Sequence, residues 1–232
     1  MRLFTLGARL LTAAVFLPEG ARVADIGTDH ARLPIWLLKT GRADSVMASD
    51  IADDPIRRAR ENVERWGVGT KVRLLQCAGF DGYRPEDFTH GVICGMGGDT
   101  IAAILDAAPW TADGAHTLIL QPETAARRLR EYLYTHHFKI MDEIAVIDGS
   151  RVYTVLKVTG GEDPHGADPL YARISYPLSL QRDEAAGRYF LRARRSLERE
   201  MQGMAVDSAA YRDAEALLSR MRELEAQNAK GI

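Results

Sequence analysis

The sequence predicts an α/β fold in which a mostly parallel sheet, covered by helices on both faces, precedes a C-terminal helical hairpin. Three observations predict it. Short runs rich in Val, Ile and Leu alternate with helix-like segments from Ala21 to about Thr159. Two further strand-like runs are joined by Asp148-Gly149-Ser150, a turn sequence typical of antiparallel hairpins. Finally, residues 181–232 carry apolar side chains at spacings of three and four, as packed helices do.

Each element follows from its own apolar pattern. Buried parallel strands are expected at 21–27, 45–50, 71–76, 90–95 and 116–121. Helices are expected between them at 31–40, 55–66, 99–107 and 125–136. The strands at 138–147 and 151–158 add an antiparallel edge. This is the layout of the Rossmann-like sheet of class I methyltransferases, and dinucleotide-binding dehydrogenases do not usually end in such a hairpin.

Composition indicates a globular protein without membrane spans. Of 232 residues 46% are hydrophobic and 27% charged, and the net charge of −2 gives no support for nucleic-acid binding by itself. No apolar run approaches bilayer length. The apolar N-terminus is interrupted by Arg9 and Thr12, so we expect an amphipathic helix of the domain and not a signal peptide. Cys77 and Cys94 lie in strand contexts, which fits a reducing cytoplasm and predicts no metal site.

The chain is expected to divide into three segments. Residues 1–160 form the α/β domain, and residues 161–180, rich in Gly, Pro and acid, form a linker. Residues 181–232 form an antiparallel, coiled-coil-like pair of helices, because their apolar seams are narrow. We expect a monomer or a weak dimer.

The first candidate site is Asp25-Ile26-Gly27-Thr28-Asp29-His30, at the end of the first strand. Nucleotide cofactors bind at the carboxyl ends of such strands, and Gly27 allows close approach. Asp25 and Asp29 would repel a pyrophosphate but attract the sulfonium and ammonium groups of S-adenosylmethionine. The motif therefore favours that cofactor and disfavours a nicotinamide oxidoreductase. Alternatively, Asp29 only caps the next helix.

Two further motifs lie at the ends of the second and fourth strands. Asp50 lies about twenty residues beyond the glycine turn, where a carboxylate can accept hydrogen bonds from both ribose hydroxyls. Cys94-Gly95-Met96-Gly97-Gly98 is rich enough in glycine to indicate close approach by a ligand, although a tight turn capped by Asp99 is the alternative. The chain lacks an Asn/Asp-Pro-Pro-aromatic loop at this point, so a ring nitrogen is favoured over an exocyclic amine as methyl acceptor.

The segments ARVADIGTDHARLPIWL, ICGMGG, LILQP and LREYLY, in this order and before a helical hairpin, resemble the bacterial TrmK family. Its members methylate N1 of the adenine at position 22 of tRNA. The resemblance runs from about Leu6 to Val158 and more loosely through the C-terminal helices. It implies S-adenosyl-L-methionine as cofactor, tRNA as partner and a cytoplasmic location. It also implies cofactor contact by Gly27, Thr28, His30, Asp50, Ile51, Gly79, Gly95, Met96 and Gly97, to which we add the neighbouring Asp25, Ala78 and Cys94.

The chain departs from the family pattern in three places. Ala78 stands where an Asp or Asn is usual, Glu123 where Asn is common, and Tyr176 where Gly precedes a proline. We therefore expect a divergent member. A methyltransferase of another substrate and a non-catalytic relative that binds RNA or protein remain alternatives.

Adenine N1 carries a free lone pair, so the expected reaction needs no obligatory general base. Positioning of the two reactants can then supply roughly 7–11 kcal/mol of the acceleration. Asp29 is the expected stabiliser of the cationic product, and His30 is expected to orient substrate or cofactor, unless its role is structural.

Two arginine clusters are candidate tRNA contacts. Arg127 and Arg130 belong to the helix after the fifth strand, and Arg188, Arg192 and Arg195 belong to the first tail helix. The alternative for the tail is an ordinary solvated helix face.

Overall fold

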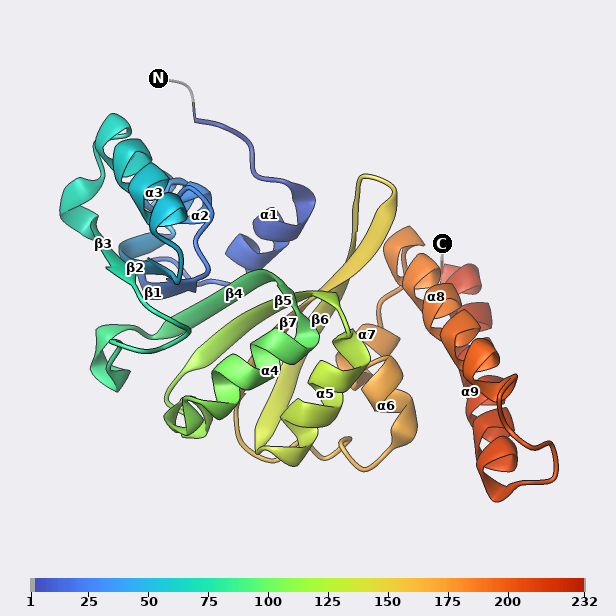
Figure 1. Ribbon diagram of the computed structural model, residues 1–232. Coiled ribbons are helices and arrows are strands. Elements are labelled where there is room, and N and C mark those ends of the chain that lie inside the picture. The colour runs from blue at the N-terminus through green and yellow to red at the C-terminus, as the bar shows by residue number, and fades with distance from the viewer. Residues whose placement is uncertain (1–2, 232) are drawn as a thin grey trace.

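The computed structural model describes residues 3–231, and its centre is a seven-stranded sheet within that range (Figure 1). The strand order is β3-β2-β1-β4-β5-β7-β6. Five strands are parallel: β1 (Ala21–Ile26), β2 (Ala43–Asp50), β3 (Val72–Gln76), β4 (His90–Gly97) and β5 (Thr117–Thr124). The edge consists of β6 (Phe138–Asp148) and β7 (Arg151–Gly160), and β7 pairs antiparallel with both β5 and β6. The predicted fold class is confirmed.

Helices cover both faces of the sheet, as Figure 1 shows. One face carries α1 (Ala8–Val15), α2 (Arg32–Lys39) and α3 (Asp53–Arg65), and the other carries α4 (Gly98–Asp106) and α5 (Ala126–Thr135). The side chains of the central strand β5 alternate between these two layers of helices. Leu118 and Leu120 pack with α4 and α5, whereas Ile119 between them packs with α1 and α2. All three side chains are buried, as a strand sandwiched between helix layers requires.

Short 3-10 helices occupy three of the connections. They are η1 (Gly69–Lys71), η2 (Pro85–Asp87) and η3 (Pro109–Ala112). The expected N-terminal amphipathic helix is α1, whose Ala13 and Ala14 pack against the sheet.

The predicted linker is wrong in its second half. Residues 169–179 form two short helices, α6 (Pro169–Arg173) and α7 (Tyr176–Ser179). The side chains of Asp168 and Ser175 cap them by accepting hydrogen bonds from Leu170 N and Leu178 N. Prolines in the first turn of each helix suit this geometry. Leu170 and Leu178 are buried with the tail helices, so this segment belongs to the folded core.

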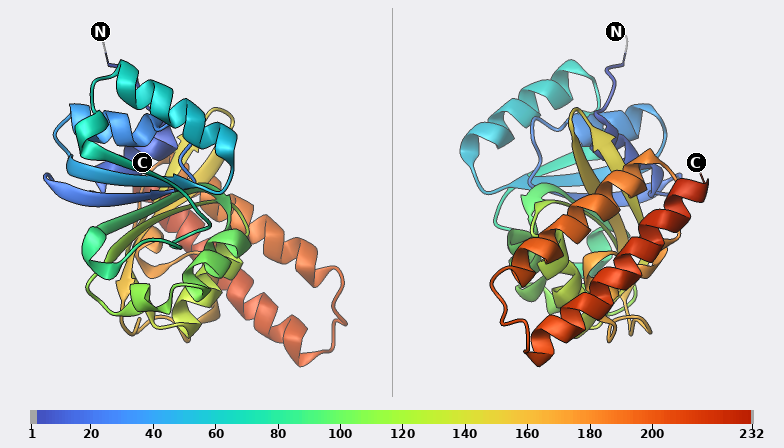
Figure 2. Two further views of the ribbon diagram at one scale, coloured as in Figure 1. Left: turned by 60° about the vertical axis from the view of Figure 1, so that its left-hand side comes forward. Right: turned by 90° about the vertical axis from the view of Figure 1, so that its right-hand side faces the viewer.

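The tail is the helical hairpin that the apolar spacing predicts. α8 (Glu184–Met201) and α9 (Ala209–Gly231) lie side by side and antiparallel in both views of Figure 2. Phe190, Leu197 and Met221 are buried between them and the domain. The hairpin is also tied to the rest of the chain by ion pairs, such as that between Arg220 of α9 and Asp168.

Candidate functional site

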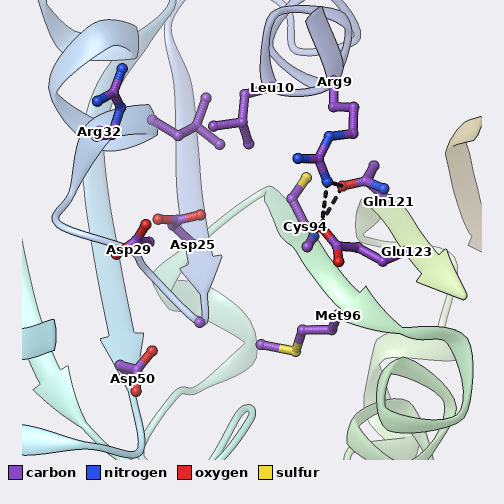
Figure 3. A pocket seen from close by; sticks show the side chains of 13 residues that line it. Arg9, Leu10, Asp25, Asp29, Arg32, Asp50, Cys94, Met96, Gln121 and Glu123 are labelled. Carbon is purple, nitrogen blue, oxygen red and sulfur yellow. Dashed lines mark hydrogen bonds and ion pairs between the residues drawn. The ribbon is translucent and has the colours of Figure 1, made fainter. Parts of the chain in front are cut away.

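A cavity of about 370 Å³ lies at the carboxyl ends of β1, β2, β4 and β5. In Figure 3 the acidic residues of β1 and β2 occupy one side of it, and residues of β4 and β5 occupy the other. Six of the predicted cofactor-binding residues and the predicted catalytic Asp29 line the cavity. They are Asp25, Gly27, Asp50, Cys94, Gly95, Met96 and Asp29.

The turn after β1 is held open by backbone geometry. Gly27 has φ +78°, and the amides of Gly27 and Thr28 both donate to Ser49 O at 2.8 Å. A Cβ at Gly27 would lie 2.1 Å from Met96 Cε, so a larger residue would intrude into the cavity. The following His30 also has positive φ, an uncommon conformation for a residue with a side chain.

Asp29 does not cap α2. The N-cap position of that helix is Ala31, and no side chain caps it. The Asp29 side chain is instead 82% exposed, and its Oδ1 lies 3.0 Å from His30 Nε2. The Asp29 carboxylate is therefore accessible in the lining of the cavity, with the His30 ring beside it.

The acidic side of the cavity is suited to a cation. Asp25 is buried, and this burial raises the pKa of its carboxyl to about 6, with a further contribution from the charge of Asp50. Asp50 is half-buried, and its Oδ1 accepts a hydrogen bond from Ala52 N. Among the described residues 3–231 its Oδ2 has no hydrogen-bond donor, so this oxygen is available to a hydroxyl group. A positively charged group beside Asp25 would offset the cost of ionising this carboxylate.

The glycine run at the end of β4 and the start of α4 serves both packing and access. A Cβ at Gly98 would lie 2.5 Å from Ala125 O, so this glycine lets α4 approach the β5–α5 turn. Gly95, with φ +80°, has open space on its Cβ side and donates its amide to Gln121 Oε1. Asp99 pairs with Arg128 and does not cap α4. The alternative of a turn capped by Asp99 is therefore not what the structure shows.

The remaining predicted cofactor residues lie outside this cavity. Ala78 and Gly79 line a second cavity of about 450 Å³ between the β3–β4 connection and α4. Thr28 is buried beneath the turn, and Gly97 is the N-cap residue of α4. Ile51 directly follows β2 and is 71% exposed, which leaves a large apolar surface beside Asp50.

Several cavity residues were not expected from the sequence. They are Arg9, Leu10, Arg32, Leu33, Gln121 and Glu123. Arg9 extends from α1 over the ends of β5 and β6, where it bonds Glu123 and Asp148. The sequence indicates α1 only as an amphipathic helix, and no local pattern says which strand ends it reaches.

Arg130 is not a tRNA contact, and this prediction is wrong. Its side chain has no exposed surface and bonds Glu143 through two nitrogens and the hydroxyl of Tyr189 through a third contact. The other four predicted arginines are exposed: Arg127, Arg188, Arg192 and Arg195. Arg192 also donates to Val152 O and lies 4.9 Å from the centre of the Tyr189 ring.

The donor set fits S-adenosylmethionine. The buried carboxylate of Asp25 suits an ammonium or sulfonium group, the free oxygen of Asp50 suits a ribose hydroxyl, and Ile51 offers an apolar surface for a purine. Within residues 3–231, no group of three or more His, Cys, Asp or Glu side chains is arranged to hold a metal ion. None of the helices in that range has the length and apolar character needed to cross a bilayer.

Comparison with known proteins identifies the same family along most of the chain. A family model for a methyltransferase domain matches residues 6–156. The tRNA (adenine(22)-N(1))-methyltransferase of Bacillus subtilis (strain 168) is 35% identical over 175 residues, which are 75% of this chain and 72% of the relative.

Two solved structures extend the similarity into the tail. The crystal structure of the B. subtilis m1A22 tRNA methyltransferase TrmK has a TM-score of 0.80 at 28% identity, covering 98% of this chain and 99% of that chain. Streptococcus pneumoniae Sp1610, assigned as a tRNA (m1A22) methyltransferase and solved in complex with S-adenosyl-L-methionine, also has a TM-score of 0.80. Its identity is 27%, over 94% of this chain and 98% of that chain. The chain therefore belongs to the TrmK-type family of class I methyltransferases.

Proposed function

We propose that this protein transfers the methyl group of S-adenosyl-L-methionine to N1 of adenine 22 in tRNA. The observation that carries the proposal is the cavity itself. It combines the buried carboxylate of Asp25, the partly free carboxylate of Asp50 and the open glycine turn at Gly95 in a TrmK-type chain. Acids and glycines in this arrangement recognise a cationic nucleoside and not a diphosphate.

The cofactor would supply an electrophilic methyl group on a positively charged sulfur. Asp25 and Asp50 would hold its charged and ribose ends, while Gly95 leaves room for it and Gly27 leaves room for the end of Met96. Adenine N1 is occupied in a Watson–Crick pair, so the target base must be unpaired or flipped before transfer. The exposed carboxylate of Asp29 would then stabilise the positive charge that develops on the methylated ring.

The tRNA would lie across the face shared by α5 and α8. Arg127 and Arg192 line a groove of about 250 Å³ between these helices, together with Arg173 and Arg199. Arg188 and Arg195 extend the exposed basic surface along α8. Guanidinium groups spaced along one face suit successive phosphates of an RNA backbone.

The decisive experiment is transfer of labelled methyl to unmodified tRNA, with the modified base mapped. Asp50→Ala should weaken cofactor binding, and Asp29→Asn should slow transfer with little effect on cofactor affinity. If both variants retain wild-type rates, the assigned site is wrong even where the activity is real. Cofactor binding without transfer to tRNA would indicate another substrate. Absence of cofactor binding to the wild-type protein would indicate a non-catalytic relative.

A cytoplasmic location and a monomeric or weakly dimeric state complete the proposal. The location follows from the tRNA substrate, and both remain predictions.

A further inference from the structure

Arg9 bridges two carboxylates at the edge of the candidate site. Its Nε donates to Asp148 Oδ2 at 2.8 Å, and its Nη1 donates to Glu123 Oε1 at 2.5 Å. The guanidinium lies 4.5 Å from the centre of the Tyr153 ring and 3.4 Å from Gln121 Oε1. Contacts on several sides therefore fix the position of this side chain, although it comes from a helix remote in sequence.

The two carboxylates differ in what they face. Glu123 lines the cavity, whereas Asp148 lies at the end of β6 outside the set of cavity-lining residues. Arg9 engages Oε1 of Glu123, and within residues 3–231 the other oxygen, Oε2, has no hydrogen-bond donor. The Glu123 side chain is 42% exposed, so an incoming group can reach that oxygen.

The edge of adenine that carries N1 also carries a hydrogen-bond donor. Its exocyclic 6-amino group donates, whereas guanine presents a carbonyl oxygen at the same position and a protonated N1. An ionised carboxylate only accepts hydrogen bonds, so one placed opposite position 6 would bind the adenine amino group and repel the guanine oxygen. Together Arg9, Glu123 and Asp148 carry one net negative charge, which also favours a methylated, cationic adenine.

We propose that Glu123 is a specificity-determining residue whose free carboxylate oxygen accepts a hydrogen bond from the 6-amino group of the target adenine. Arg9 is a positioning residue that holds this carboxylate at the edge of the cavity. This inference rests on the proposed function, because it assigns the recognition of the base in the same reaction.

The test compares tRNA containing adenosine at position 22 with tRNA containing purine riboside there. Purine riboside retains N1 but lacks the 6-amino group. Replacing adenosine by purine riboside should lower the kcat/KM of the wild-type enzyme more than that of Glu123→Ala, by a further factor of about ten or more. The reason is that a site that pairs with an amino group discriminates against a base without one. The weaker nucleophilicity of purine N1 affects both enzymes equally, so it cancels in this ratio.

Two further variants distinguish a role of Glu123 in base recognition from a purely structural role. Asp148→Asn removes the other carboxylate partner of Arg9 and should retain wild-type discrimination between the two tRNAs, whatever its rate. Glu123→Gln keeps the size of the side chain and one neutral acceptor oxygen, so it should retain part of the discrimination. The discrimination between the two tRNAs should therefore be strongest for the wild type and Asp148→Asn, intermediate for Glu123→Gln and weakest for Glu123→Ala. A purely structural role for Glu123 would not produce this order.

The proposal is overturned if Glu123→Ala discriminates between the two tRNAs as strongly as the wild type does. It is also overturned if Glu123→Ala weakens cofactor binding by the same factor as it lowers kcat/KM, because Glu123 would then contact the cofactor. Failure of the wild-type enzyme to methylate adenosine 22 is a different outcome, which removes the proposed function and this inference together.

Discussion

Arg130 and Glu143 form an ion pair with no exposed side-chain surface, at the junction between α5 and β6. Arg130 Nε lies 2.9 Å from Glu143 Oε2, and the same guanidinium bonds the carbonyl of Arg173 and the hydroxyl of Tyr189. Tyr189 belongs to α8 and Arg173 to α6. One buried guanidinium therefore joins the α/β domain to the first tail helix, and its hydrogen bonds compensate for its desolvation.

Replacement of Arg130 by Met should lower the free energy of unfolding by about 3–5 kcal/mol, because it leaves Glu143 buried without a partner. Urea denaturation measures this change. Arg128→Met, which removes an exposed pair with Asp99 on the same helix, should be indistinguishable from the wild type. The double variant Arg130→Met/Glu143→Leu should recover much of the loss. A stable Arg130→Met variant would show that the pair does not hold the tail.

The error over Arg130 shows what an arginine cluster in a sequence does and does not establish. Ala126, Leu129 and Leu133 form the buried stripe of α5, at helical spacings of three and four. Position 130 falls on that stripe, whereas 127 and 128 fall on the exposed face. The periodicity that predicted the helix therefore contained the signal. Arg130 was nevertheless assigned to the exposed face, because a fully buried arginine is rare.

The site was predictable to the extent that sheet topology determines it. Asp25, Asp50 and Gly95 each lie at or near the carboxyl end of a parallel strand, and neighbouring parallel strands place their carboxyl ends together. The contact between Arg9 and Glu123 could not be predicted from sheet topology. Their contact depends on how α1 packs on the sheet, which involves side chains more than one hundred residues apart. The position of Ala78 in a separate cavity depends likewise on how the β3–β4 connection packs against α4.

Gly27→Ala should weaken cofactor binding by about tenfold or more with only a modest loss of stability. The left-handed backbone at φ +78° costs a residue with a Cβ roughly 1–2 kcal/mol. The added methyl would also force the flexible end of Met96 to move within the cavity. Titration calorimetry with S-adenosylmethionine measures the affinity, and thermal denaturation measures the stability.

Gly41→Ala is the matched control for this substitution. Gly41 has a similar φ of +74°, but its Cβ position has no atom within 4 Å and it does not line the cavity. It should show only the loss of stability that the left-handed backbone causes, with unchanged cofactor affinity. Equal cofactor affinity in both variants would mean that the cofactor does not approach Gly27.

Arg188→Gln and Arg195→Gln should each weaken tRNA binding and reduce its dependence on salt. Both side chains are exposed on α8, and within residues 3–231 Arg195 has no carboxylate partner. Each lost phosphate contact should lower the slope of log Kd against log salt concentration by about one. Arg60→Gln, an exposed arginine on α3 far from the tail in Figure 1, is the control. Equal effects for all three variants would argue against a tRNA-binding face on α8.

Asp25 should make cofactor binding and protein stability respond oppositely to pH. Burial raises the pKa of this carboxyl to about 6, above its ordinary value of 3.8 in the unfolded chain. As pH rises from about 4 to about 6, the unfolded chain releases the proton first, so the free energy of unfolding falls across this window. The difference of about two pKa units corresponds to roughly 3 kcal/mol.

Asp25→Asn removes this penalty, because the amide does not ionise. The variant should be more stable than the wild type at pH 7 to 8, with a difference that narrows as the pH falls toward 4, as denaturant titration at several pH values can show. Its affinity for S-adenosylmethionine should be lower, and the wild-type affinity should decline below about pH 6, where the folded protein protonates Asp25. A wild-type affinity that stays constant from pH 8 to pH 5 would show that the ionised carboxylate of Asp25 does not hold the positive charge of the cofactor.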